Sequence, residues 1–187
     1  MSDSAPPARK VVLTLFMSLD GVIEEPGDWG GPYRSDDGRA FKEAELFGAD
    51  LLLLGRVTYE GFARYWPGAE GGGAFAARMN SLPKVVATTT LSKPEWNASF
   101  VADVAGEVER LKRQPGGDIL IYGSGTLAQT LMKHNLIDEY RLLVYPLVLG
   151  HGQRLFPHPA APLQLTLVST QTLGSGVVAL TYQPKSL

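Results

Sequence analysis

Three short stretches rich in glycine or in hydroxyl side chains each follow an apolar, strand-like segment of the sequence. They are Gly55-Arg56-Val57-Thr58, Thr88-Thr89-Thr90 and Gly123-Ser124-Gly125-Thr126. In an open α/β sheet the carboxyl ends of the strands line one crevice, so these junctions are expected to converge there. Helices that begin in such a crevice present free N–H groups and the positive end of their dipoles, which suits a diphosphate.

The side chains of these stretches would add to such a site. Arg56 would make a charge-assisted, bidentate contact with a phosphate. Further hydroxyl donors are expected from Thr58, Thr88 and Thr89. One such junction has an ordinary structural explanation, because glycine accepts unusual dihedral angles and Ser or Thr caps helices. Three junctions in one crevice favour phosphate binding.

The third stretch also fits a dinucleotide-binding fingerprint. Gly123, Gly125 and Ala128 occupy the positions of G-x-G-x-x-A. In a Rossmann unit this motif follows the first strand, and an acidic residue ends the next strand about 20 residues later. Here the motif follows the fourth predicted strand, and Asp138-Glu139 begins the next strand instead of ending it. The pattern indicates a dinucleotide site on a different fold.

A long loop after the first predicted strand carries further candidates. Asp20, in Ser18-Leu19-Asp20-Gly21, lies where that strand leaves the sheet. It has two interpretations, a polar or proton-donating role and an Asx-type turn into Gly21. Trp29 in the same loop is predicted to stack on a flat substrate ring, the alternative being ordinary packing.

Composition excludes several classes of protein. The 187 residues include no cysteine, which excludes disulfides, thiolate zinc sites and thiol nucleophiles. No two of the three histidines have ligand spacing with a carboxylate, so we expect no metal site. The net charge of −2 and the lack of a basic run argue against nucleic acid as a partner. Residues 1–9 are predicted to be a disordered tail that is neither a signal peptide nor a membrane anchor. The apolar runs are too short to span a bilayer. We therefore expect a cytoplasmic protein without a membrane partner.

The elements that must position these residues follow from apolar patterning. Strands are predicted at residues 11–17, 50–54, 84–90 and 118–122, and helices at 40–47, 59–65, 75–82, 104–114 and from 126 onward. The segment 91–102 is predicted to be a loop with some extended character. After it the order changes to three extended runs at 139–149, 163–172 and 177–182, the last two joined by a hairpin turn. This order predicts an α/β domain with a mixed sheet.

The ordered set of segments VVLTLFMSLDGVI, DLLLLGRVTYEGF, KVVATTTL, DILIYGSGTLAQTLM and DEYRLLVYPLVLGHGQRLF resembles a known family. It is similar to the reductase domain at the C-terminus of the riboflavin-biosynthesis protein RibD, within the dihydrofolate reductase-like superfamily, over residues 11–182. The resemblance implies a three-layer α/β/α fold over residues 10–187. Its central sheet would be mixed and mostly parallel, with antiparallel C-terminal strands.

The resemblance also implies an NADPH-dependent reductase related to 5-amino-6-(5-phosphoribosylamino)uracil reductase. Hydride would pass to a C=N or C=O carbon of a small heterocyclic or sugar-linked substrate. Matching positions are Gly55, Arg56 and Thr58 at the cofactor phosphates, Thr88 and Thr89 near the 2′-phosphate, Gly123, Ser124, Gly125 and Thr126 at the diphosphate and nicotinamide, and Asp20 and Gly21 in the loop that closes over the nicotinamide.

Departures from the family pattern bear on the substrate. The riboflavin reductases continue after S-L-D-G with a basic residue, whereas this chain reads VIEEPGDWGG. A dihydrofolate or pterin reductase, whose acid would be Glu43 or Glu45, and a non-catalytic nucleotide-binding or interaction module therefore remain alternatives. The long apolar strand at 141–149 further predicts a homodimer, through pairing or packing with a second copy.

Overall fold

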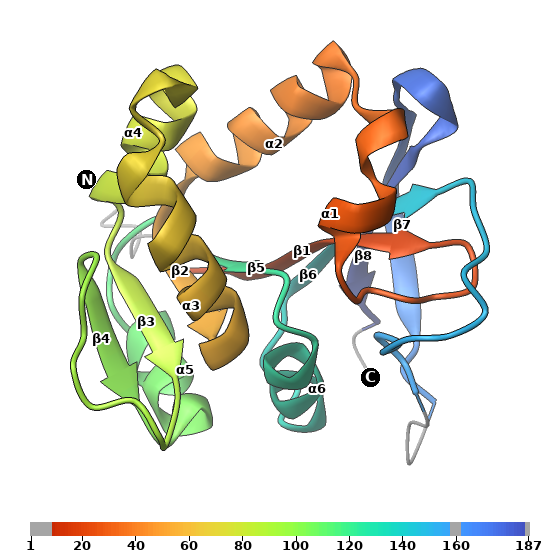
Figure 1. Ribbon diagram of the computed structural model, residues 1–187. Coiled ribbons are helices and arrows are strands. Elements are labelled where there is room, and N and C mark those ends of the chain that lie inside the picture. The colour runs from red at the N-terminus through yellow and green to blue at the C-terminus, as the bar shows by residue number, and fades with distance from the viewer. Residues whose placement is uncertain (1–8, 158–161, 186–187) are drawn as a thin grey trace, which may run out of the picture.

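Eight strands form one mixed sheet in the computed structural model, which describes residues 9–157 and 162–185 (Figure 1). Their order across the sheet is β4-β3-β2-β5-β1-β6-β8-β7. Strands β1 to β6 run parallel, and β8 is antiparallel to both β6 and β7. The bounds are β1 Val11–Ser18, β2 Ala49–Gly55, β3 Lys84–Ala87, β4 Ala98–Val101, β5 Asp118–Tyr122, β6 Glu139–Tyr145, β7 Leu165–Thr172 and β8 Val178–Pro184.

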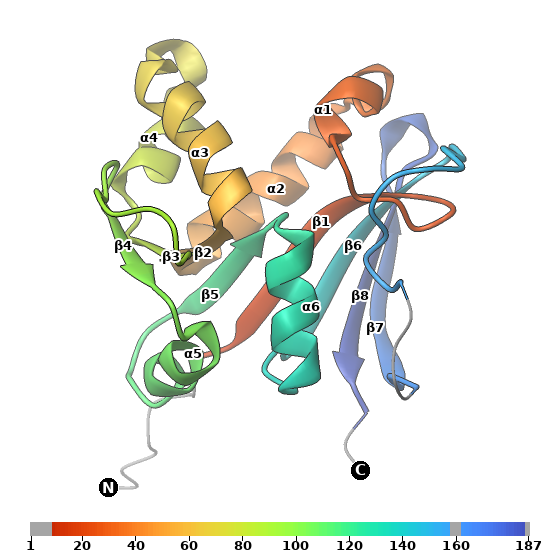
Figure 2. The same ribbon diagram turned by 60° about the horizontal axis from the view of Figure 1, so that its bottom comes forward.

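Helices cover both faces of this sheet. Their bounds are α1 Pro26–Trp29, α2 Asp36–Gly48, α3 Arg56–Tyr65, α4 Gly73–Ser81, α5 Val104–Lys112 and α6 Gly125–Lys133, with single 3₁₀ turns η1 Gly31–Tyr33, η2 Trp66–Gly68, η3 Glu70–Gly72 and η4 Gly174–Gly176. Helices α2, α3 and α4 pack on one face, and α5 and α6 on the other (Figure 2). The predicted three-layer α/β/α fold with antiparallel C-terminal strands is confirmed.

The two faces follow from the alternation of side chains along buried strands. Leu13, Ile119 and Ile121 point toward α5 and α6, whereas Val12 and Leu120 point toward α2, α3 and α4. All five are fully buried. Near-continuous apolar runs are expected for parallel strands covered on both faces, and β1 lies between β5 and β6 within the sheet.

Helix α2 begins at Asp36, four residues before the predicted start. Ser35 caps it, because the Ser35 hydroxyl accepts a hydrogen bond of 3.2 Å from the Gly38 N–H. Asp36 and Asp37 then lie in the first turn, where carboxylates interact favourably with the helix dipole. The long loop predicted at 21–38 therefore contains α1, η1 and the first turn of α2.

The third strand was predicted too long, and the fourth strand of the structure was missed. Strand β3 ends at Ala87, because the Thr88 hydroxyl accepts hydrogen bonds of 3.2 Å from the N–H groups of Thr90 and Leu91 and turns the chain away. Strand β4 lies in the segment predicted to be a loop. It is a four-residue edge strand without a fully buried residue, so its sequence carries little apolar signal.

Strand β6 ends at Tyr145, before Pro146, and its backbone pairs with β1 on one side and β8 on the other. The strand predicted at 139–149 was therefore too long. Because β6 has no free edge for a second copy, the prediction of strand pairing there is wrong, and the homodimer stays a prediction.

Of the predicted tail, residues 1–8 lie outside the described residues. Arg9 is buried, and its Nε donates a hydrogen bond to the Gly117 carbonyl.

The described ranges include no helix with both the length and the apolar character needed to cross a bilayer.

Candidate active site

Two of the three predicted junctions are joined directly by a serine hydroxyl. The Ser124 hydroxyl accepts a hydrogen bond of 2.8 Å from the Gly55 N–H and donates one of 2.8 Å to Thr58 Oγ1. A Cβ at Gly55 would lie only 3.2 Å from the Ser124 side chain, so glycine permits this close approach. The junctions after β2 and β5 therefore meet, as expected for adjacent parallel strands.

The third junction lies at the same edge of the sheet. Ala87, the last residue of β3, pairs with Gly55, the last residue of β2. Thr88 and Arg56 therefore leave the sheet side by side. All three predicted junctions therefore lie together at the carboxyl ends of β2, β3 and β5, a region that we call the crevice.

The donors of this crevice suit a dinucleotide. Helices α3 and α6 both begin there, from opposite faces of the sheet, and neither has a side-chain hydrogen bond at its N-cap. Their first-turn N–H groups, with the positive ends of both dipoles, are thus available to phosphate oxygens. Gly123 and Ser124 have φ values of 57° and 63°, so two consecutive left-handed residues form the turn that aims α6.

The predicted side-chain ligands differ in availability. Arg56 is half-exposed and forms an ion pair of 2.9 Å with Glu60 one helical turn away. Thr89 is exposed at the crevice, whereas the Thr88 hydroxyl already accepts two backbone hydrogen bonds. Thr58 Oγ1 accepts a hydrogen bond from the Ser124 hydroxyl. A hydroxyl that accepts keeps its own O–H donor, so Thr58, Thr88 and Thr89 can each donate to a phosphate, as can the guanidinium N–H groups of Arg56 outside its pair with Glu60.

Asp20 ties together the loops that follow β1 and β6. Its Oδ1 accepts hydrogen bonds from the Ser18 hydroxyl at 2.7 Å and the Leu149 N–H at 3.1 Å, and its Oδ2 accepts one from the Gly150 N–H at 2.9 Å. Arg154 lies 3.4 Å from the same carboxylate. The Ser18 hydroxyl, followed by the two backbone donors, holds the pKa of Asp20 well below its usual range. This geometry makes Asp20 an anchor between two loops, without an Asx-type turn, because the Val22 N–H donates to the Ser18 hydroxyl instead of the Asp20 carboxylate. The polar or proton-donating role of Asp20 stays a prediction.

The loops joined by Asp20 also cover the start of α6. Gly125 packs so closely under Ile23 that a Cβ on it would lie 2.5 Å from the Ile23 side chain. Gln153 extends its amide to within 3.4 Å of the Thr126 hydroxyl. Gly21 takes a left-handed φ of 86°, a conformation that favours glycine at this turn. The loops therefore lie over the crevice at the nicotinamide end that the resemblance implies.

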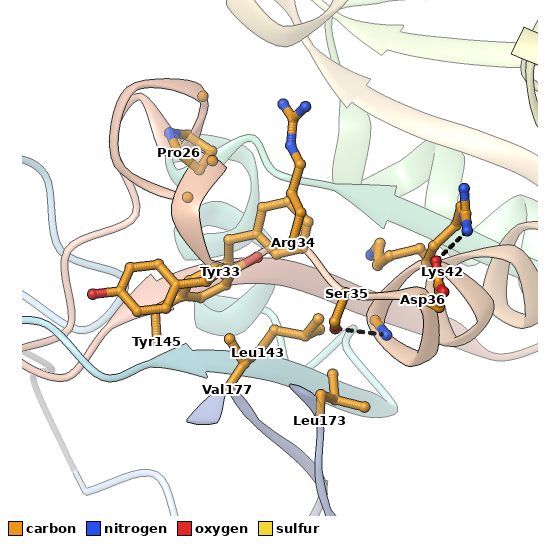
Figure 3. Close-up of a pocket in the computed structure, with 16 residues that line it drawn as sticks. Pro26, Tyr33, Arg34, Ser35, Asp36, Lys42, Leu143, Tyr145, Leu173 and Val177 are labelled. Atoms are coloured by element: carbon orange, nitrogen blue, oxygen red, sulfur yellow. Dashed lines mark hydrogen bonds and ion pairs between the residues drawn. The ribbon is translucent and has the colours of Figure 1, made fainter. Parts of the chain in front are cut away.

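A cleft of about 540 Å³ opens between α1 and α2 on one side and β6 and the turn that joins β7 to β8 on the other (Figure 3). Aromatic and aliphatic side chains form most of its wall, and cationic groups lie at the rim and at the deep end. The lining residues include Phe16, Tyr33, Arg34, Leu143, Tyr145 and Lys42. Ligand sites commonly combine an apolar lining with a few polar groups in this way.

Trp29 lies behind this wall. Its indole N–H donates to the Glu24 carbonyl at 2.9 Å, and its ring meets the Tyr145 ring edge-on with centroids 5.2 Å apart. Tyr145 faces the cleft and also contacts Tyr33 and Phe16. Trp29 thus supports an aromatic residue that the sequence did not single out, and its own contact with substrate stays a prediction.

The deep end of the cleft contains a buried charge cluster. Lys42 Nζ lies 2.6 Å from Glu45 Oε2 and donates a hydrogen bond of 2.7 Å to the Thr14 hydroxyl, which itself donates to Glu45 at 3.0 Å. Arg141 Nη1 lies 3.9 Å from the other Glu45 oxygen. Of the two helix carboxylates left open by the sequence, Glu43 is exposed and Glu45 is buried in this cluster.

Thr14 links the cleft residue Lys42 to the crevice residue Gly123 through hydrogen bonds. The Thr14 carbonyl accepts a hydrogen bond of 3.2 Å from the Gly123 N–H, and Thr14 pairs with Tyr122 in the parallel β1–β5 register. Thr14 therefore contacts the first residue of the glycine turn through its backbone and Lys42 through its side chain. A molecule in the cleft would lie next to one held in the crevice.

No group of three His, Asp or Glu side chains within residues 9–157 and 162–185 is arranged to hold a metal ion.

The sequence of this chain matches the model of the RibD C-terminal domain family over residues 9–179. YyaP of Bacillus subtilis (strain 168), whose function is uncharacterised, is 33% identical over 181 residues, covering 93% of this chain and 94% of YyaP.

Two crystal structures share the fold. A bifunctional diaminohydroxyphosphoribosylaminopyrimidine deaminase and 5-amino-6-(5-phosphoribosylamino)uracil reductase from Thermotoga maritima superposes with a TM-score of 0.66 at 15% identity, over 95% of this chain and 57% of that one. Dihydrofolate reductase from Enterococcus faecalis, complexed with NADP(H), superposes with a TM-score of 0.64 at 18% identity, over 95% of this chain and 97% of that one. These similarities confirm the dihydrofolate reductase-like fold.

Proposed function

This chain belongs to the RibD C-terminal domain family, and on that premise we propose that it is an NADPH-dependent reductase. Its substrate carries a C=N or C=O carbon in a small heterocyclic or sugar-linked molecule. The observation that carries the proposal is the hydrogen-bonded link at Thr14, which joins a ligand-sized cleft to a crevice lined with phosphate-binding donors.

The crevice supplies what a dinucleotide phosphate needs. The N-termini of α3 and α6 approach from opposite faces of the sheet, so the diphosphate lies across the strand ends between them. Arg56 exchanges its ion pair with Glu60 for a bidentate guanidinium contact with the 2′-phosphate. Because NADH has no 2′-phosphate, this contact distinguishes NADPH from NADH. When bound, the cofactor supplies the hydride, and the chain supplies orientation and a site that excludes water.

The cleft supplies what a flat substrate needs. Phe16 and Tyr145 present apolar ring surface, and Arg34 is placed on the rim to meet an anionic or strongly polar substituent. Such a site aligns a planar ring by stacking and a polar arm by charge.

A dihydrofolate or pterin reductase is the second candidate. It is supported by the fold shared with the Enterococcus faecalis enzyme and by the buried carboxylate of Glu45 on α2. Because Glu45 Oε2 is already paired with Lys42 and Thr14, we favour the first candidate. A nucleotide-binding module without turnover is the remaining alternative, and a substrate screen followed at the nicotinamide absorbance separates it from both reductases.

Titration with NADPH and NADH tests the cofactor proposal. NADPH is expected to quench tryptophan fluorescence and to raise the melting temperature, as required of a ligand that binds only the folded state. Arg56→Ala is expected to weaken NADPH much more than NADH, with the exposed helix residue Arg110→Ala on α5 as the matched control. Equal losses for both cofactors would contradict the role of Arg56, and no response to NADPH would contradict the reductase.

A further inference from the structure

The buried ammonium at the deep end of the cleft has bonding capacity that the fold does not use. A lysine ammonium has three N–H donors. One is directed to Glu45 and a second to Thr14, and the hydrogen bonds of the described residues include no acceptor for the third. The Lys42 side chain is only 13% exposed, yet it forms part of the cleft wall (Figure 3). The third donor is therefore available to a molecule in the cleft.

The surroundings fix where this ammonium lies. Lys42 extends from α2 across the sheet and places Nζ 4.3 Å from the centroid of the Tyr122 ring and 5.5 Å from that of Phe16. Tyr122 directly precedes the glycine turn of the crevice, and Thr14, bonded to Nζ, accepts the Gly123 N–H. Lys42 thus lies where the cleft and the crevice are linked, which is where hydride transfer would occur.

We propose that Lys42 is the catalytic acid of the reduction, giving its proton to the substrate nitrogen or oxygen as hydride adds to the adjoining carbon, and that Glu45 is the positioning residue that holds it. The inference rests on the proposed reductase function.

The electrons and atoms balance without a further reactant. The hydride forms a C–H bond, the π-electron pair of C=N or C=O moves to the heteroatom, and that atom takes a proton from Lys42 Nζ. The cofactor is oxidised and the substrate reduced by two electrons. Lys42 is left as a neutral amine and regains a proton from solvent once the product leaves the open cleft.

The charges around Nζ suit this role. Burial lowers the pKa of Lys42, the Glu45 carboxylate opposes part of that fall, and Arg141 adds to it. At the rim of the cleft, Arg34 and the ion pair of Asp36 with Arg39 are exposed and screened by solvent. A buried lysine whose pKa lies nearer to neutral gives up its proton more readily than an exposed one.

The other candidate acids are less well placed. Asp20 is a charged loop anchor whose carboxylate accepts hydrogen bonds from the chain, and Glu43 is exposed outside the cleft. Tyr33 and Tyr145 do line the cleft, but burial raises the pKa of Tyr145 and weakens it as an acid. The tyrosines are therefore the rivals that an experiment must separate from Lys42.

The test compares Lys42→Arg with the matched variant Lys112→Arg, whose lysine lies on α5 and pairs with Asp138. Arginine keeps the positive charge beside Glu45 but does not release a proton at working pH. The probes are 5-amino-6-(5-phosphoribosylamino)uracil and dihydrofolate, with NADPH oxidation measured by single-turnover absorbance. Lys42→Arg is expected to slow hydride transfer about 100-fold or more, as loss of a general acid does, while Lys112→Arg stays within about twofold.

Two further readouts distinguish an acid from a structural lysine. In the wild type the rate should fall as pH rises through the pKa of Lys42, and Lys42→Arg should lose this dependence. Glu45→Gln should move the fall to lower pH, because removal of the carboxylate lowers the pKa of Lys42. A wild-type rate in Lys42→Arg, or a large loss in Tyr145→Phe alone, would overturn the proposal.

A substrate-free measurement separates this proposal from the proposed function. NADPH affinity, measured by fluorescence, should be within about twofold of wild type in Lys42→Arg. Failure of the wild type to bind NADPH would contradict the proposed reductase function, whereas the proton-donating role of Lys42 is tested separately by its titration. Lysine-selective ¹³C labelling then gives the titration of Lys42, identified by the signal missing from Lys42→Arg. A titration below that of free lysine supports the assignment even without turnover, and one at or above it overturns the assignment.

Discussion

The crevice at the ends of β2, β3 and β5 is made from consecutive residues of short turns, whereas the cleft beside α2 is assembled from side chains far apart in the sequence. Backbone N–H groups dominate the crevice, with Ser124 joining two of its turns. Aromatic rings and a buried ion pair form the cleft, drawn from β1, α2 and β6. The difference implies that cofactor binding depends mainly on the backbone of these turns and on Arg56, while substrate choice depends on the side chains of the cleft.

Removal of Tyr145 should break the cleft while sparing the crevice. Its ring is buried and meets three aromatic rings edge-on, at centroid distances of 5.4, 5.2 and 5.7 Å. Tyr145→Ala is expected to cost about 3–5 kcal/mol of unfolding free energy, as for other buried aromatic residues. Urea unfolding measures the loss, with exposed Tyr65→Ala as the control. Loss of NADPH affinity in the folded variant would contradict the independence of the two regions.

Lys84 is a second buried lysine and differs from Lys42 in having no carboxylate partner among the described residues. Lys84 Nζ lies 3.9 Å from the Trp96 ring centroid and donates to the Asn80 carbonyl at 3.0 Å. Burial lowers the pKa of Lys84 to about 8, against 10.5 for the free side chain. Between these pH values the unfolded chain binds more protons than the folded one, so stability rises with pH.

The variant Lys84→Met isolates this contribution. The wild type should gain up to about 3 kcal/mol relative to Lys84→Met between pH 8 and pH 10.5, since a tenfold change in a proton-binding constant corresponds to about 1.4 kcal/mol. Thermal or urea unfolding at several pH values measures the difference. A difference that does not change with pH would show that Lys84 titrates normally.

A side chain at Gly55 should break the crevice and spare the cleft. A Cβ there lies 3.2 Å from Ser124, so Gly55→Val is expected to cost about 2 kcal/mol by overpacking and to weaken NADPH binding by at least tenfold. Gly61→Val on α3 is the matched control, because apart from the adjacent residues and the backbone of α3 no described atom lies within 4 Å of the new Cβ. Equal effects of both substitutions on NADPH would contradict the contact.

The smallest expected effect comes from the hydroxyl that joins the two junctions. Ser124→Ala leaves the Gly55 N–H without its partner, which costs about 1 kcal/mol of unfolding free energy. Ser81→Ala removes an exposed hydroxyl whose one hydrogen bond among the described residues is to the Arg78 carbonyl, and it should change stability by less than half as much. If the two variants are equally stable, the link between the junctions contributes nothing measurable.

Sequence predicted the parts of this molecule that depend on local chemistry. Each glycine-rich junction follows a strand, and β5 was predicted with its observed bounds, so parallel pairing alone brought Gly55 and Ser124 together. Edge strand β4 was missed because half-buried residues carry no alternation. The start of α2 had a signal in Ser35, since a serine before two acidic residues is typical of an N-cap.

The cleft was beyond such patterns. Lys42 is one of several charged residues on α2, a pattern that sequence alone would assign to an exposed helix. Its burial follows from the tertiary structure, in which its ammonium donates a hydrogen bond to Thr14 on β1. The same limit left Glu43 and Glu45 undecided, because helical spacing alone does not say which face meets the sheet. Tyr145 became a cleft residue because β8 and α1 enclose it, and both are distant in sequence.

Backbone amide NMR of the wild-type protein during NADPH titration tests whether the crevice is the cofactor site. The shifted amides are expected to include Arg56, Val57 and Thr58 at α3 and Gly125 and Thr126 at α6, while Leu173 to Val177 at the far side of the cleft stay unchanged. No shifts, or shifts confined to the cleft, would contradict the assignment of the crevice as the cofactor site.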